Sequence, residues 1–346
     1  MAILVTGAAG FIGMHVAKHC LANGHTVVGV DNLNDYYDVA LKERRIALLD
    51  NQEHFVFHRF DLRDRDATGD LFQSFEFQTV IHMAAQAGVR YSLEAPQTYI
   101  DSNLVAFGNI LEGCRQRDVK HLIYASSSSV YGANTHIPFA VGDNVDHPIS
   151  LYAATKKSNE LMAHAYSHLF QLPTTGLRLF TVYGPWGRPD MALYLFTQAI
   201  LEGRPIDIYN NGEMKRDFTY VDDVVESVYR LMSQPATENP DWTGDAPDPA
   251  TSNAPYRIYN VGCHQPVALL DFIETLEECL QVKAIRNYLP LQPGDVPTTF
   301  ADVSALRDHI DYEPHTSLRD GIEKFVRWYQ SYHSRTEKGA NNIAGS

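Results

Sequence analysis

The stretch AILVTGAAGFIG, residues 2–13, decides the fold of this chain. An apolar run at residues 3–6 predicts a buried strand, and a helix is expected from Phe11 onward. Between them, the glycines at positions 7, 10 and 13 let backbone amides approach a pyrophosphate, and the amino end of the helix adds partial positive charge. The spacing is GxxGxxG rather than the more general GxGxxG, and a tight turn without a ligand is the alternative.

The first half of the chain alternates apolar strands with helical stretches. Further strands are expected at 26–30, 55–57, 80–83, 121–125 and 175–179, and helices at 11–23, 40–49, 65–73, 103–117 and 152–169. The runs at 80–83 and 121–125 are almost continuously apolar, as in parallel strands that are covered on both faces. The alternation predicts an α/β fold with a doubly wound parallel sheet of the Rossmann type.

Beyond residue 184 the pattern loosens, because Pro and Gly interrupt shorter strands and helices. We expect residues 1–184 to form a nucleotide-binding Rossmann domain, to which later segments return. Residues 185–333 are expected to form a smaller C-terminal α/β substrate lobe. The polar residues 334–346 predict a disordered tail.

Composition excludes several classes of function. The formal net charge of −14 over 346 residues argues against nucleic-acid binding by the whole surface. Four scattered cysteines without a CxxC motif indicate reduced thiols and a cytoplasmic protein. No apolar run has membrane-spanning length, and the fifteen histidines form no HExxH or comparable cluster, so neither a membrane segment nor a metal is expected.

Two acidic residues follow successive strands and extend the nucleotide site. A carboxylate at Asp31 can accept hydrogen bonds from a ribose 2′-hydroxyl and would repel a 2′-phosphate, which favours NAD over NADP. Asp61, followed by Leu62, is placed where an acid can meet the adenine amino group. The alternatives are an exposed turn acid at Asp31 and a plain loop acid at Asp61.

A tyrosine, a lysine and a serine suggest the chemistry. Tyr152 and Lys156 are spaced i, i+4, so they share one face of the helix expected at 152–169. A lysine charge near a phenol favours the phenolate, which can act as a base at neutral pH. Ser127 follows the strand at 121–125, at the end of a parallel strand where ligands bind. Together these residues predict redox chemistry on a hydroxyl group. Without Tyr152 and Lys156, the serine run would be read as an ordinary polar loop.

On these motifs the chain resembles the extended short-chain dehydrogenase/reductase family, and within it the nucleotide-sugar 4-epimerases. The resemblance covers nearly the whole chain and is nearest to the UDP-glucuronate 4-epimerases. It is carried by DNLNDYYD at 31–38, AAQAGVR at 84–90, FTVYGPWGRPDM at 180–191 and RDFTYVDD at 216–223.

The resemblance implies a catalytic set and a cofactor. Tyr152 takes the proton of the sugar 4-hydroxyl while the C4 hydride passes to NAD⁺, and Ser127 steadies the same oxygen. Lys156 lowers the pKa of Tyr152 and holds the nicotinamide ribose. The 4-keto sugar then turns over and takes the hydride back on its other face, so that NAD is recycled. The implied NAD contacts are Gly7, Gly10, Phe11, Ile12, Gly13, Asp31, Asn32, Asp61, Leu62, Ala84, Ala85, Tyr152 and Lys156.

A uronate substrate adds a requirement of its own. A 4-keto uronate is a β-keto acid that loses CO₂ readily, so an epimerase must hold the breaking bond out of line with the ketone. Arg188 is the candidate clamp, because a guanidinium fork matches a carboxylate. The implied substrate contacts are Ser128, Arg90, Thr181, Arg188, Arg216 and Asp295, of which Arg216 and Asp295 are expected at the diphosphate and uridine. Arg90 could equally bind the diphosphate or a partner subunit.

The expected product is UDP-galacturonate for surface polysaccharide, and other readings remain open. One is 4-epimerisation of a neutral UDP-hexose or UDP-N-acetylhexosamine. Another is UDP-glucuronate decarboxylation, although Ser129 stands where decarboxylases typically carry a glutamate. A third is a nucleotide-binding protein that has lost catalysis. The intact Tyr152/Lys156 pair argues against that alternative. The helices at 103–117 and 152–169 resemble those that form a four-helix interface in the family, which implies a homodimer.

Overall fold

The computed structural model describes residues 2–292 and 295–343. At its centre lies a parallel sheet with the strand order β10-β6-β5-β4-β1-β2-β3. The strands are β1 (Ala2–Thr6), β2 (Thr26–Asp31), β3 (Phe55–Arg59), β4 (Phe77–His82), β5 (His121–Ser127), β6 (Thr174–Leu179) and β10 (Tyr256–Val261). The expected doubly wound α/β fold is confirmed. The order reverses at β1 and β4, and ligands of such sheets bind outside the carboxyl ends of the strands at this point.

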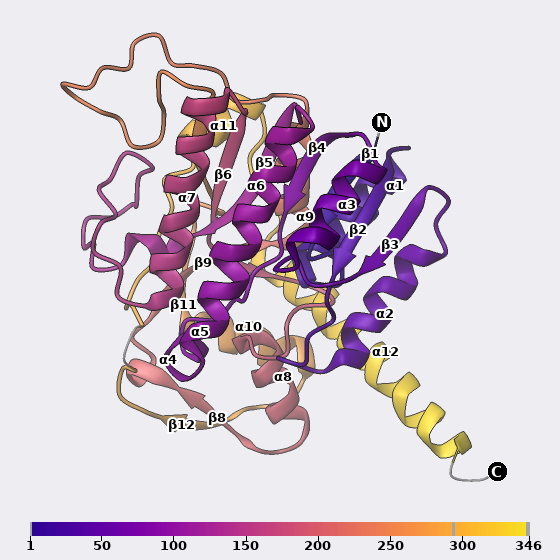
Figure 1. The fold of residues 1–346 in the computed structure, drawn as a ribbon. Coiled ribbons are helices and arrows are strands. Elements are labelled where there is room, and N and C mark those ends of the chain that lie inside the picture. Colours follow the sequence, from indigo (N-terminus) through magenta and orange to yellow (C-terminus); the bar gives the residue numbers. More distant parts are fainter. Residues whose placement is uncertain (1, 293–294, 344–346) are drawn as a thin grey trace.

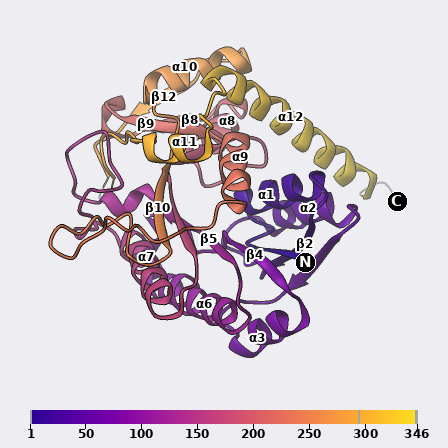
Figure 2. The same cartoon turned by 90° about the horizontal axis from the view of Figure 1, so that it is seen from above.

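Helices cover both faces of the sheet (Figures 1 and 2). One face carries α1 (Phe11–Ala22), α2 (Val39–Asp50) and α9 (Val221–Met232), and the other carries α3 (Arg65–Ser74), α6 (Ala106–Gln116) and α7 (Leu151–Phe170). Successive strand residues point to opposite faces, so Val5 joins the core under α1 whereas Leu4 joins the core under α6. Burial of each such aliphatic side chain contributes about 1.5–3 kcal/mol.

Short helices connect β4 to α6 and β5 to α7. They are α4 (Tyr91–Glu94), α5 (Pro96–Ile100), a π-helix η1 (Asp101–Val105) that runs into α6, and a 3₁₀ turn η2 (Ser128–Tyr131). The helical segment expected at 103–117 therefore begins earlier, and its first part is a π-helix. Such π-turns are often found at functional sites.

A smaller lobe lies beyond the carboxyl edge of the sheet (Figure 1). Its strands are β7 (Thr181–Tyr183), β8 (Pro205–Ile208), β9 (Lys215–Tyr220), β11 (Pro266–Ala268) and β12 (Ile285–Tyr288), and its helices are α8 (Ala192–Leu201), η3 (Tyr209–Gly212), α10 (Leu269–Leu280) and α12 (Leu318–Ile343). The remaining helix, α11 (Ser304–Ile310), packs on β10 and α9 at the central sheet. Between the segments of this lobe the chain returns to the central sheet, where β10 pairs with β6.

The segment between α9 and β10 is a long loop that projects from the molecule, and α12 runs out toward the C-terminal end (Figure 1). α12 continues to Ile343, through most of the segment that we expected to be a disordered tail, while residues 344–346 lie outside the described residues. Among the residues that the structure describes, no helix combines the length and the apolar character needed to cross a bilayer.

Candidate active site

The glycine-rich turn joins β1 to α1 at the reversal of strand order. Gly7 has a positive φ of 70°, and a Cβ built on it would lie 2.8 Å from the backbone nitrogen of Ala84. A Cβ on Gly10 would lie 2.9 Å from the carbonyl oxygen of Gly7, and one on Gly13 would collide with the same oxygen. The turn is thus closed to side chains, and the first amides of α1 have no partner within the helix. This geometry fits a dinucleotide pyrophosphate.

Asp31, at the end of β2, is oriented by two backbone amides. Its Oδ2 accepts from Ala9 at 3.1 Å and its Oδ1 accepts from Leu33 at 2.9 Å. Burial raises the pKa of Asp31, against the lowering effect of these two hydrogen bonds. The carboxylate is therefore fixed beside the glycine turn, where a ribose of the same dinucleotide would lie.

Asp61 lies next to Asn32, and Leu62 after it is buried. The Nδ2 of Asn32 donates to Asp61 at 2.8 Å, and Arg63 forms an ion pair with the same carboxylate at 2.8 Å. Burial raises the pKa of Asp61, but the hydrogen bonds from Arg63 and Asn32 leave it below its usual value. The structure thus brings Asp61 into contact with Asn32, the residue after Asp31. The Asp61 carboxylate already accepts hydrogen bonds from Asn32 and Arg63 within the protein.

The segment after β4, which includes Ala84 and Ala85, is tied to both neighbouring elements. Ala84 donates to the Thr6 hydroxyl at 3.3 Å. Two residues on, the backbone nitrogen of Gln86 donates to Asn103 Oδ1 at 2.8 Å, and Asn103 Nδ2 donates to Thr155 Oγ1 of α7 at 3.0 Å. Asn103 of the π-helix was missed by the sequence analysis, because no local motif marks it.

Ser127 and Tyr152 meet at the carboxyl end of β5. Ser127 caps η2 by accepting from Ser129 at 3.1 Å, and Tyr152 lies in the first turn of α7, which Ser150 caps. Burial raises the pKa of Tyr152, whereas its hydrogen bond with Ser127 and the charge of Arg188 lower it. The two hydroxyls therefore interact with each other.

Lys156 lies one turn further along α7 and is buried. Its Nζ donates to the carbonyl oxygen of Ala125 at 2.7 Å, and burial lowers its pKa to about 8. The charge of Arg188 lowers the pKa of Tyr152, and the expected influence of Lys156 on that phenol stays a prediction.

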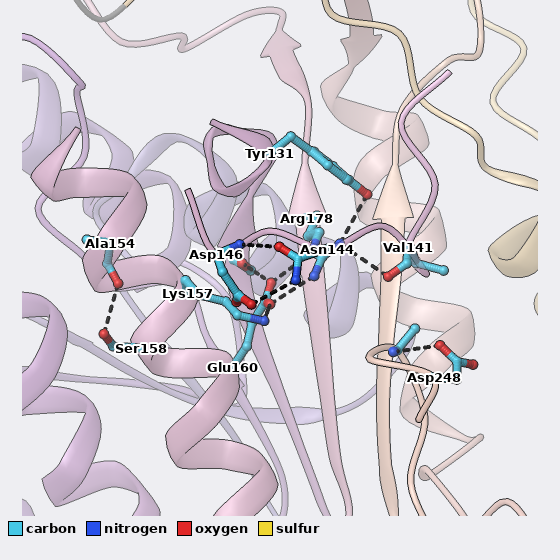
Figure 3. Close-up of polar contacts among 12 residues, drawn as sticks. Tyr131, Val141, Asn144, Asp146, Ala154, Lys157, Ser158, Glu160, Arg178 and Asp248 are labelled. Atoms are coloured by element: carbon cyan, nitrogen blue, oxygen red, sulfur yellow. Dashed lines mark hydrogen bonds and ion pairs between the residues drawn. The ribbon is translucent and has the colours of Figure 1, made fainter. Parts of the chain in front are cut away.

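Behind this helix lies a buried ion pair that the sequence analysis did not foresee (Figure 3). Arg178 of β6 pairs with Glu160 of α7 through two hydrogen bonds of 2.9 and 3.0 Å. Glu160 also accepts from the Ser126 hydroxyl at 2.7 Å, and Arg178 donates to Tyr131 at 3.2 Å. Ser126 precedes Ser127, and Glu160 lies four residues after Lys156, so the network holds β5, β6 and α7 in register.

Arg188 follows β7 in the loop at residues 184–191, here called the clamp loop. Its Nε donates to Asp190 Oδ1 at 2.9 Å and its Nη2 to Asp190 Oδ2 at 2.5 Å. Burial lowers the pKa of Arg188, but the charge and hydrogen bonds of Asp190 raise it above its ordinary value. Arg188, Thr181 of β7 and Phe11 of α1 line one pocket, which places the clamp loop next to the first turn of α1.

The clamp loop is held by the nucleotide-binding elements. His15 of α1 contacts the carbonyl oxygen of Pro185 at 2.9 Å. Arg45 of α2, which is fully buried, donates to the carbonyl oxygen of Trp186 at 2.6 Å and to that of Ala9 at 2.9 Å. A signal for Arg45 was available in the sequence, because Leu41 and Leu49, four residues to either side, mark the buried face of that helix.

A second group of predicted residues converges at the smaller lobe. Arg90 donates to Asp295 at 3.2 Å and lies over the ring of Tyr209 at 4.8 Å. Arg216 donates to the carbonyl oxygen of Pro297 at 3.1 Å; burial and the charge of Arg90 lower its pKa, which Asp295 raises. Two guanidinium groups beside one carboxylate form a cationic site, a suitable place for a diphosphate. Ser128 lies apart from this group, in η2 beside Ser127.

Comparison with known proteins places the chain among nucleotide-sugar epimerases and related enzymes. Residues 3–262 match the NAD dependent epimerase/dehydratase family. The chain is 57% identical to Protein CapI of Staphylococcus aureus, over 97% of this chain and 100% of that protein. It is 52% identical to a probable UDP-glucuronate 4-epimerase of Rhizobium meliloti, over 97% and 98% of the two chains.

A solved structure has the same architecture. It is the crystal structure of a UDP-glucuronic acid 4-epimerase from Bacillus cereus in complex with UDP-glucuronic acid and NAD, with a TM-score of 0.84 and 34% identity over 96% of this chain and 100% of that one. With the family match spanning most of its length, the chain belongs to the NAD dependent epimerase/dehydratase family.

Proposed function

We propose that the protein is a UDP-glucuronate 4-epimerase, which forms UDP-galacturonate through a transient 4-keto sugar and supplies it for surface polysaccharide. The observation that carries this proposal is the meeting of Ser127, Tyr152 and Arg188: the hydroxyl pair is suited to C4 chemistry, and the partly buried guanidinium whose charge acts on Tyr152 is suited to a C6 carboxylate. The relatives from Rhizobium meliloti and Bacillus cereus support the same substrate.

NAD supplies a reversible hydride acceptor next to the sugar C4. In our proposal the glycine turn and the amino end of α1 bind its pyrophosphate, and Asp31 binds the adenosine ribose. Lys156 holds the nicotinamide ribose. The full set of proposed contacts is Gly7, Gly10, Phe11, Ile12, Gly13, Asp31, Asn32, Asp61, Leu62, Ala84, Ala85, Tyr152 and Lys156.

Tyr152 acts as the base that takes the proton of the 4-hydroxyl. Ser127, which is hydrogen-bonded to Tyr152, faces the same oxygen and stabilises the charge that develops on it. After the sugar has turned over, the phenol of Tyr152 returns the proton to the ketone oxygen. Because one group serves both directions, no second acid is required.

The remaining proposed contacts divide between the two ends of the substrate. Arg188, with Thr181 and Ser128, binds the C6 carboxylate. Arg90, Arg216 and Asp295 bind the diphosphate and the uridine ribose, where the structure gathers them.

The test is incubation with UDP-glucuronate without added reductant, followed by chromatography and mass spectrometry. An isomer of unchanged mass supports the proposal. A product lighter by CO₂ indicates a decarboxylase, and turnover of UDP-glucose alone indicates a neutral-hexose epimerase. Tyr152→Phe should lower turnover by about 10²–10⁴-fold. Tyr166→Phe, the same change further along α7, should not; equal turnover in both variants would contradict the assigned base.

We further infer a cytoplasmic homodimer built on α6 and α7. Two leucines of α7 face outward: Leu161 is 60% exposed and Leu169 is 67% exposed. Leu161→Asp should convert the dimer to a monomer in light scattering. Leu195→Asp, on α8, is a matched control at a 48% exposed leucine. A monomeric wild-type protein would refute the dimer.

A further inference from the structure

The guanidinium of Arg188 has a carboxylate partner in its own loop. Nε and Nη2 of Arg188 each donate to a different oxygen of Asp190. These two donors form one edge of the planar fork. The edge between Nη1 and Nη2 is a second edge with the same bidentate geometry, and it can take another carboxylate. Asp190 was not among the residues expected to contribute to the site.

Asp190 is itself held by a residue from the nucleotide-binding half. The Tyr36 hydroxyl donates to Asp190 Oδ2 at 3.0 Å, across 154 residues of sequence. The ring of Tyr36 packs against Tyr91 with centroids 4.8 Å apart. Gly88, which has a φ of 106°, leaves room for this arrangement, since a Cβ there would lie 2.8 Å from the Tyr36 hydroxyl and 3.8 Å from Arg188 Nη2.

The pair is well suited to fix an orientation. A bidentate contact between a guanidinium and a carboxylate defines a plane, which a single hydrogen bond does not. The Arg188 and Asp190 side chains are 20% and 29% exposed, so solvent competes little for these donors. The hydrogen bond from Tyr36 removes the remaining freedom of the carboxylate.

We propose that Asp190, held by Tyr36, is a positioning residue that sets the plane of Arg188 so that its second edge holds the C6 carboxylate of a UDP-uronate out of line with the C4 ketone. This inference rests on the proposed epimerase function. It assigns to Asp190 and Tyr36 the control of a side reaction rather than of epimerisation itself.

The side reaction is decarboxylation of the 4-keto intermediate. When the C5–C6 bond lines up with the ketone, that bond breaks and CO₂ leaves. The electron pair passes into the enolate of the C4 ketone, and a solvent proton then adds at C5 to give a UDP-4-keto-pentose. A tilt of the guanidinium therefore changes the product rather than only the rate.

The experiment measures the ratio of decarboxylated product to UDP-galacturonate, with UDP-glucuronate labelled at C6 and the released CO₂ counted. Asp190→Asn keeps the shape of the side chain but removes its charge and one of its two acceptor oxygens, and should raise the ratio by about ten- to a hundredfold. Tyr36→Phe should raise it by about two- to tenfold, because one hydrogen bond is lost. Affinity alone is no test, since loss of the Asp190 charge also strengthens the attraction between Arg188 and a carboxylate.

Glu202→Gln is the matched control. Arg204 Nε donates to Glu202 at 2.6 Å, so this pair has the same separation of two residues, but it is exposed on the surface. The ratio should stay at the wild-type value. A shift of similar size in all three variants would overturn the inference.

The outcomes separate the two proposals. If wild-type protein makes no UDP-galacturonate, the proposed function fails. If wild-type protein epimerises and a cooperatively melting Asp190→Asn variant keeps the wild-type ratio, the positioning role fails. Should Asp190→Asn not fold, an unchanged ratio in Tyr36→Phe overturns the role and a raised ratio supports it.

Discussion

Arg45 donates a 2.6 Å hydrogen bond from Nη2 to the carbonyl oxygen of Trp186, 141 residues away in the sequence. Through Nη1 the same guanidinium reaches the carbonyl oxygen of Ala9 at 2.9 Å. Trp186 has a φ of 63°, a left-handed conformation that costs a non-glycine residue about 1–2 kcal/mol. One buried side chain therefore joins the nucleotide turn to the clamp loop and helps to offset the strain within it.

Arg45→Lys should lower the free energy of unfolding by about 2–4 kcal/mol, because an ammonium cannot reach both carbonyl oxygens and leaves buried acceptors without a donor. Urea denaturation measures this change. Arg44→Lys is the control: Arg44 lies over the ring of Tyr332 at 4.7 Å, where a lysine keeps the cation. Equal losses in both variants would contradict the bridging role of Arg45.

Ser127→Ala should move the pH dependence of turnover to higher pH. Tyr152 must lose its proton to act as a base, so turnover rises with pH up to the pKa of that phenol. The hydrogen bond from Ser127 lowers this pKa, and its removal raises it. At a fixed pH below the midpoint fewer molecules hold the phenolate, and with the lost charge stabilisation turnover should fall by about 10²–10³-fold.

The midpoint is read from kcat against pH at saturating UDP-glucuronate. Ser129→Ala serves as the control, because the backbone nitrogen of Ser129, and not its side chain, contacts Ser127. A Ser127→Ala profile that keeps the wild-type midpoint would show that Ser127 does not tune the base.

Asp31→Ser should weaken NAD binding by about ten- to a hundredfold, because hydrogen bonds to a charged acceptor are lost. The same change should strengthen NADP binding, since the repulsion of a 2′-phosphate disappears. Calorimetric titration with each dinucleotide measures both effects. Asp35→Ser, at an exposed acid of the following loop, should change neither affinity; unchanged NADP binding in Asp31→Ser would argue against the ribose role.

Glu160→Gln should lower the free energy of unfolding by about 3–5 kcal/mol, because it leaves the fully buried Arg178 without a counter-charge. The matched change is Glu323→Gln, which breaks a 3.0 Å ion pair with Arg327 on the surface of α12 and should cost about 0–1 kcal/mol. Thermal and urea unfolding compare the two. A small loss in Glu160→Gln would mean that the buried pair contributes little to the scaffold of α7.

Local sequence patterns predicted the position of a residue wherever a single helix, strand or turn fixes that position. The glycines of the turn follow from the close approach of α1 to β1, and Tyr152 and Lys156 share a face because their spacing matches the helical repeat. Such a pattern does not specify which distant residue a side chain contacts. Lys156 shows this, since its ammonium donates to the carbonyl oxygen of Ala125, 31 residues away in the sequence.

The sequence by itself determined the alternation of strands and helices, the glycine-rich turn, Asp31 at the end of its strand, Ser127 at the end of β5 and Tyr152 in the first turn of α7. These features depend on short-range backbone geometry and on the rule that parallel strands end at a common edge. Only the tertiary structure decided that Arg45 holds the clamp loop and that Tyr36 and Asp190 hold Arg188. Those contacts join segments 141 and 154 residues apart, and such pairings arise from packing of the whole chain rather than from any local repeat.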